Sequence, residues 1–166
     1  GSNPSDRVMQ AMLDANRNFV DMGDLLDKSG EYIAEQLGVE SAYPTSGGAA
    51  ALVLSAAACI AGTDQALIGE LPKTRIKKDK ILIQKSHRNG FDRCFAIAGA
   101  RLVEVGDNPS WTANELDQAI DDETAAVAYL NPFYYDVSNK PLQETVSVSR
   151  KHSVPVIIDA SCSIYP

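Results

Sequence analysis

The sequence has few cysteines and histidines and no apolar run long enough to span a bilayer. Its three cysteines, Cys59, Cys94 and Cys162, are odd in number and show no Cys-x-x-Cys spacing. This pattern predicts reduced thiols, no disulfide framework and no metal site. Charged residues occur throughout the first twenty positions, so a signal peptide is not expected either. We therefore expect a cytoplasmic protein without a membrane partner.

Basic residues are also scarce. The sequence has fifteen lysines and arginines and twenty-two acidic residues, which gives a net charge of −7. Nucleic-acid binding usually requires a basic face, so the composition argues against a nucleic-acid partner. Hydrophobic residues make up 45% of the 166 residues, which is typical of a chain with a packed core.

From residue 80 onward, apolar strands alternate with helices. The expected strands are 80–84, 101–105, 124–130 and 154–158, and the expected helices are 90–98, 113–120 and 142–152. Such alternation is typical of βαβ units, and continuous apolar strands are typical of a sheet covered on both faces. The pattern predicts a three-layer α/β/α sandwich with a mostly parallel sheet.

Two helices are expected before this region, at 4–20 and 22–37, with Asp21 as the cap of the second. Gly30 lies inside the second helix, where glycine costs about 1 kcal/mol relative to alanine, so a close contact is expected there. We divide the chain into an N-terminal helical segment, 1–38, and part of a large domain, 39–166. Residues 63–79 are expected to form a loop.

The stretch 42–62 is the most informative part of the sequence. A short strand at 42–43 meets the turn Thr-Ser-Gly-Gly, and an uncharged Ala/Leu/Val segment then runs to Gly62. A helix that is apolar on nearly every face is expected to be buried. Its exposed N-terminal amides would bind a phosphate at Ser46, Gly47 and Gly48. The alternative is a serine cap with glycines that serve close packing only.

Polar residues follow the other expected strands. Asn131 and Asp159 come directly after a strand, and His87 comes three residues after one. Parallel strands end at one edge of a sheet, where ligands bind. Taken singly, these residues are a packing histidine, a turn asparagine and a helix cap. Together with the phosphate site they suit a cofactor with a phosphate, a flat ring and a protonated ring nitrogen. That cofactor is pyridoxal 5′-phosphate (PLP).

The sequence resembles the N-terminal and large-domain portion of fold-type I PLP-dependent enzymes. The resemblance is to the branch that contains selenocysteine synthase and D-glucosaminate-6-phosphate ammonia-lyase. It rests on Thr-Ser-Gly-Gly-Ala-Ala-Ala at 45–51, His-Arg-Asn-Gly-Phe-Asp-Arg at 87–93 and Val-Pro-Val-Ile-Ile-Asp-Ala at 154–160. Segments 24–38 and 99–106 match as well.

The resemblance implies a role for each matching position. Residues 46–48 would bind the phosphate, His87 would stack on the pyridine ring, Asp159 would contact its nitrogen and Asn131 would lie near the 3-hydroxyl. Arg88 and Arg93 are candidates to bind an acidic or phosphorylated substrate, with a surface charge as the alternative.

The implied activity is that of a PLP-dependent lyase or transferase acting on an amino acid or amino sugar acid by α-proton abstraction and β-elimination or deamination. The Schiff-base lysine is expected downstream of Pro166, so these residues alone are expected to be inactive. A homo-oligomer is implied as well. Two alternatives stay open: a selenocysteine-synthase-like transferase acting on an aminoacyl-tRNA, and a non-catalytic α/β domain that binds a phosphate ligand.

Overall fold

The computed structural model of the protein describes residues 3–73, 75–106, 111–130 and 140–161. Contacts between Cα atoms divide the chain into two compact units, Gly1–Thr45 and Ser46–Pro166. Residues 39–45 thus group with the N-terminal helices, while the functional division after residue 38 stays a prediction. Within the described residues, no helix is long and apolar enough to cross a membrane.

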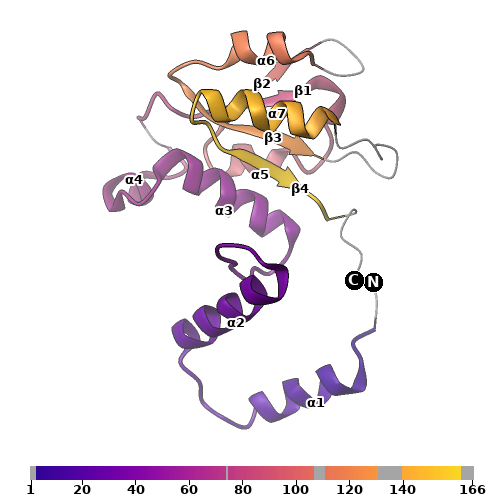
Figure 1. Ribbon diagram of the computed structural model, residues 1–166. Coiled ribbons are helices and arrows are strands. Elements are labelled where there is room, and N and C mark those ends of the chain that lie inside the picture. The colour runs from indigo at the N-terminus through magenta and orange to yellow at the C-terminus, as the bar shows by residue number, and fades with distance from the viewer. Residues whose placement is uncertain (1–2, 74, 107–110, 131–139, 162–166) are drawn as a thin grey trace. The chain divides into compact units, whose positions relative to one another are not determined.

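The N-terminal unit contains α1 (Asp6–Ala15) and α2 (Met22–Leu37) (Figure 1). Asp21 caps α2 as predicted, because its Oδ1 accepts hydrogen bonds from the backbone N–H groups of Gly23 and Asp24. A Cβ atom on Gly30 would lie 2.3 Å from the carbonyl oxygen of Ala42. The predicted close contact at Gly30 is therefore confirmed.

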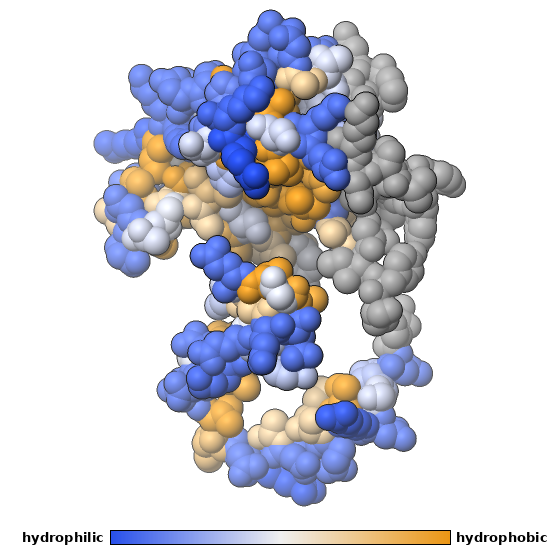
Figure 2. Space-filling model, viewed as in Figure 1, coloured by the Kyte–Doolittle hydropathy of each residue, from blue (hydrophilic) through white to orange (hydrophobic). Residues whose placement is uncertain are grey.

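Apolar side chains lie at the surface of this unit (Figure 2). No residue of α1 is buried, and the exposed apolar residues of the unit include Val8, Met12, Leu13, Phe19 and Tyr32. The prediction of a strand at 42–43 is wrong. These residues form an irregular segment whose backbone packs against α2 at Gly30.

The second unit is built on a parallel sheet. Its described strands are β1 (Lys80–Gln84), β2 (Arg101–Val105), β3 (Thr124–Leu130) and β4 (Val156–Asp159). They pair in the order β2-β1-β3-β4, and every pair is parallel. The predicted parallel sheet is confirmed, and the burial of every residue in β1 and β3 explains why both strands read as continuous apolar runs.

Helices cover both faces of the sheet, as the prediction of three layers requires (Figure 1). One face packs against α3 (Gly48–Ala61) and α5 (Arg93–Ile97), and the other against α6 (Ala113–Ala119) and α7 (Lys140–Lys151). Side chains of β1 alternate between the two cores: Ile81 and Ile83 join the first, and Leu82 joins the second.

Three local expectations were wrong. The predicted loop 63–79 contains α4 (Gln65–Glu70), whose first N–H groups are capped by Asp64. The expected helix 90–98 is shorter, because a 3₁₀ turn, Lys85–His87, and a turn at 90–92 precede α5. Helix α3 is not buried all round, since Leu54 on its outer side is 49% exposed.

Glycine is required sterically at Gly99, where the chain turns from α5 into β2. Its φ of +100° lies in the region that favours glycine. A Cβ atom there would also lie 2.3 Å from the carbonyl oxygen of Pro72. The backbone around Pro72 therefore packs directly on this turn.

Candidate functional site

The carboxyl ends of the strands meet at one edge of the sheet. Gln84 pairs with Val105 at the ends of β1 and β2, and Leu130 pairs with Asp159 at the ends of β3 and β4. Helix α3 contacts β3 and β4. In Figure 1 its N-terminal end lies at the same end of the sheet as the arrowhead of β4. This edge is where an open α/β sheet binds its ligands.

The N-terminus of α3 is suited to a phosphate. Ser46, Gly47 and Gly48 are exposed, and Gly47 has a φ of +148° that favours glycine. The N-cap residue, Gly47, has no side chain of its own with which to cap this helix. The N–H groups of a first helical turn have no intrahelical acceptor, and the helix dipole makes them attractive to an anion.

The two glycines are not needed for close packing. A Cβ atom built on Gly47 or Gly48 has no described atom within 4 Å, in contrast to Gly30 and Gly99. The idea that these glycines are kept only for packing therefore finds no support in the structure. A side chain at either position would occupy the space into which a bound phosphate could come close to the backbone.

His87 is the last residue of the 3₁₀ turn after β1. Its ring is 4.7 Å from the ring of Tyr129 on β3, centroid to centroid, and the two planes are 81° apart. Only 5% of His87 is exposed. This edge-on contact orients the imidazole, but it leaves a small surface for a cofactor ring, so stacking on PLP stays a prediction.

Asp159 ends β4 and is half-buried. Its Oδ1 accepts a hydrogen bond from the backbone N–H of Ser161 at 3.0 Å. The carboxylate is thus held by the turn that follows the strand, and it can accept a hydrogen bond from a protonated ring nitrogen. Asn131, the remaining predicted cofactor contact, lies outside the described residues.

Arg88 is engaged by two carboxylates of its own chain. Its Nε donates to Asp92, and its Nη1 donates to Glu104 on β2. The hydrogen bond to Asp92, with the charges of both carboxylates, raises the pKa of the guanidinium. Arg93 is exposed at the start of α5.

The two carboxylates around Arg88 were not predicted from the sequence. The spacing of four residues between Arg88 and Asp92 was a usable signal, although only a helix would normally bring such a pair together. Glu104 belongs to another strand, and nothing in the local sequence connects it to Arg88.

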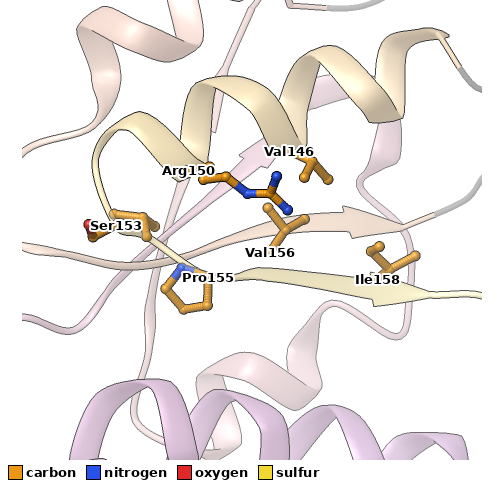
Figure 3. A pocket seen from close by; sticks show the side chains of 7 residues that line it. Val146, Arg150, Ser153, Pro155, Val156 and Ile158 are labelled. Atoms are coloured by element: carbon orange, nitrogen blue, oxygen red, sulfur yellow. The ribbon is translucent and has the colours of Figure 1, made fainter. Parts of the chain in front are cut away.

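A separate apolar groove of about 520 Å³ lies between α7 and β4 (Figure 3). Its lining includes Val146, Val156 and Ile158, and the side chain of Arg150 extends above Val156. None of the predicted cofactor residues lines it. Among the side chains that the structure describes, no cluster of three or more His, Cys, Asp or Glu residues is arranged to hold a metal ion.

Comparisons with known proteins identify relatives along nearly the whole chain, although no family model matches it. The chain is 37% identical to a 5′-C-glycyluridine monooxygenase-decarboxylase from Streptomyces sp over an alignment of 168 residues. The alignment covers 97% of this chain and 42% of that protein. It is 27% identical to a D-glucosaminate-6-phosphate ammonia lyase from Salmonella typhimurium, covering 96% and 45% of the two chains.

Solved structures give the same result for the fold. The structure of a D-glucosaminate-6-phosphate ammonia-lyase matches 96% of this chain and 44% of its own, with 28% identity and a TM-score of 0.86. An aminotransferase from Eubacterium rectale matches 93% of this chain and 42% of its own at a TM-score of 0.52 and 19% identity, which concerns the fold alone.

The chain spans less than half the length of the relatives it matches. Within that span, its large-domain fold is that of the ammonia-lyase and of an aminotransferase. The resemblance to fold-type I PLP-dependent enzymes of the ammonia-lyase type is confirmed by these matches. The link to selenocysteine synthase stays a prediction.

Proposed function

We propose that the complete protein is a PLP-dependent enzyme that acts at the α-carbon of an amino acid or amino sugar acid. The observation that carries this proposal is the N-terminus of α3, where Gly47 and Gly48 leave open space beside the backbone at the ligand-binding edge of the sheet. The relationship to a D-glucosaminate-6-phosphate ammonia lyase supports it.

In this proposal, three parts of the chain hold the cofactor. The amides of residues 46–48 and the hydroxyl of Ser46 bind the phosphate, as helix N-termini bind anions. The carboxylate of Asp159 keeps the ring nitrogen protonated, because a nearby negative charge favours the charged form of a base. His87 contacts the ring, with its own orientation fixed by Tyr129.

The reaction follows from these roles. PLP, when bound, supplies a ring that withdraws electrons from the substrate α-carbon. We propose that an α-proton is then removed and a β-substituent or ammonia is lost. The lysine that binds the cofactor and moves this proton is proposed to lie after Pro166. The inactivity of residues 1–166 alone stays a prediction.

Titration of the full-length protein with PLP tests the proposal. We expect saturable binding with a new visible absorbance band, and Asp159→Asn should weaken binding about tenfold, the effect of one hydrogen bond to a charged group. Asp122→Asn is the matched control, since Asp122 is exposed in the turn before β3, at the opposite end of the sheet. A wild-type protein that binds no PLP would refute the assignment.

The relative with 37% identity favours a second reaction on the same site. The name of that relative describes a monooxygenase-decarboxylase of a glycyl-substituted uridine. An enzyme of that kind would break the bond from the α-carbon to the carboxylate and consume O₂. Oxygen uptake with CO₂ release would support this branch, whereas ammonia release without oxygen uptake would support the lyase.

An aminoacyl-tRNA transferase and a non-catalytic phosphate-binding domain predict different results. The transferase should shift a tRNA in a gel at moderate salt, which the net charge of −7 makes unfavourable. The non-catalytic domain should show no PLP absorbance band, so PLP titration separates it from both kinds of enzyme.

A further inference from the structure

We propose that Asp92 and Arg88 are positioning residues that hold His87 in the cofactor site. This inference rests on the proposed function and assigns Arg88 a role other than substrate binding. It concerns the segment 87–92, called here the His87 loop, which begins at the last residue of the 3₁₀ turn after β1 and leads into α5. Every residue of this loop is described by the structure.

Asp92 stands at the cap position of α5 but does not cap it. Its carboxylate faces back into the His87 loop, where Oδ2 accepts hydrogen bonds from Arg88 Nε and from the backbone N–H of Asn89. The Asp92 side chain is only 4% exposed. A buried carboxylate that leaves its helix uncapped is explained by its contacts with the loop.

Asn89 extends this network to His87. Its side-chain Nδ2 donates to the carbonyl oxygen of His87 at 3.3 Å, and its Oδ1 accepts from the N–H of Phe91 at 2.8 Å. Asp92 therefore reaches the backbone of His87 through a single intervening residue. A change at Asp92 should move the histidine that packs against Tyr129.

Arg88 fixes the loop to the neighbouring strand. Its guanidinium joins Asp92 on the loop to Glu104 near the carboxyl end of β2, so the loop is tied to the strand next to β1. The charge of Arg88 is already offset by these two carboxylates. A substrate anion would have to compete with both, which favours positioning over direct substrate binding.

The two roles predict different effects on the protein without substrate. If Arg88 positions His87, its loss leaves Asp92 buried without its charged partner, and the His87 loop must rearrange. Cofactor affinity then falls before any substrate is added. If Arg88 binds substrate, cofactor affinity stays constant and only KM rises.

The experiment uses the full-length protein and measures PLP affinity and the visible circular dichroism of bound PLP without substrate. We expect Asp92→Asn and Arg88→Gln each to lower PLP affinity about tenfold and to change the dichroic band. Glu104→Gln removes the charge of the more exposed of the two carboxylates that bind Arg88. It should lower PLP affinity in the same direction but by less.

Arg101→Gln is the matched control. Arg101 also contacts two carboxylates, Asp79 and Glu123, but at the amino end of β2, far along the strand from the His87 loop. Its loss should leave PLP binding unchanged. If Arg88→Gln fails to fold, Asp92→Asn and Glu104→Gln still provide the test.

Three outcomes are decisive against the inference. Wild-type affinity and dichroism in Asp92→Asn and Arg88→Gln would overturn it and leave the proposed function intact. A rise in KM alone in Arg88→Gln would show that this arginine binds substrate. Absence of PLP binding in the wild-type protein would remove the proposed function and this inference with it.

Discussion

At the scale of single residues, glycines of this chain serve two different physical purposes. A side chain at Gly30 or Gly99 would overlap with backbone carbonyl oxygens, so both positions are set by packing. Gly48 has open space around it, and its φ is not in the region that favours glycine. Nothing in the described fold itself requires glycine at Gly48, and the proposed phosphate would use the space that its missing side chain leaves.

Gly48→Ala should therefore separate stability from cofactor binding. Alanine is the better helix former, so we expect the protein without PLP to gain about 0.5 kcal/mol in its free energy of unfolding. The new methyl group fills the phosphate site, so PLP affinity should fall at least about tenfold. Urea unfolding and PLP titration of the full-length protein measure the two effects.

Gly69→Ala is the control for that variant, because Gly69 lies in α4 with no described atom near its missing Cβ. It should leave PLP binding unchanged. Unaltered PLP affinity in Gly48→Ala would contradict the phosphate site at α3.

A second residue-scale prediction concerns Lys80, which is buried at the start of β1. Its Nζ lies 2.6 Å from Asp121 Oδ2 and donates to the carbonyl oxygen of Ala119 at 3.0 Å. Asp121→Asn leaves this ammonium without its carboxylate, so we expect a loss of about 1–3 kcal/mol in the free energy of unfolding, measured in urea.

The same pair predicts a pH dependence. The hydrogen bond from Lys80 lowers the pKa of Asp121 below its ordinary value of 3.8. A carboxylate with a depressed pKa stabilises the fold above its unfolded pKa, and this contribution is lost as the pH falls through the folded value. The difference between wild type and Asp121→Asn should therefore shrink below about pH 4. A constant difference would argue against the pair.

At the scale of elements, the sequence was sufficient to predict those helices and strands that are determined by a local capping residue or by burial of apolar side chains. The four strands were recognised because a sheet covered on both faces needs continuous apolar runs, as Ile81, Leu82 and Ile83 show. The start of α2 was recognised from Asp21, which caps it. Helix α4 was missed although Asp64 caps it in the same way, because its few residues bury no apolar side chain that would mark a period.

The parts of the candidate site that were not predictable depend on contacts between elements. The phosphate-binding end proposed for α3 follows from local sequence, because two glycines precede an apolar helix. The hydrogen bond from Arg88 to Glu104 requires β1 and β2 to lie side by side. The ring contact between His87 and Tyr129 requires β3 to lie beside β1. Strand order is a property of the folded sheet, and it cannot be predicted from the sequence of any single segment.

Gly30→Ala tests the packing of the irregular segment on α2. The added methyl group would overlap with the carbonyl of Ala42, and overpacking of this kind costs about 1–3 kcal/mol, more than the gain in helix propensity. We expect faster proteolysis within residues 1–45 of the full-length protein. Gly69→Ala again serves as the control, and an equal rate in both variants would show that the segment can move away without cost.

At the scale of the whole molecule, the chain is acidic and divides into two compact units. The unit formed by Ser46–Pro166 carries Ser46, His87 and Asp159, so one folded body supplies these proposed cofactor contacts. Several large apolar residues of the N-terminal unit, including Phe19 and Tyr32, are exposed. A homo-oligomer stays a prediction from the resemblance.

The contrast between Gly99 and Gly48 has a consequence for how this protein can change over evolutionary time. Gly99 is held by the clash with Pro72, so selection for folding alone retains it. Gly48 carries no such constraint. A lineage that gave up the cofactor would be free to replace Gly48 while keeping Gly99, and the two positions together would record which descendants still use the site.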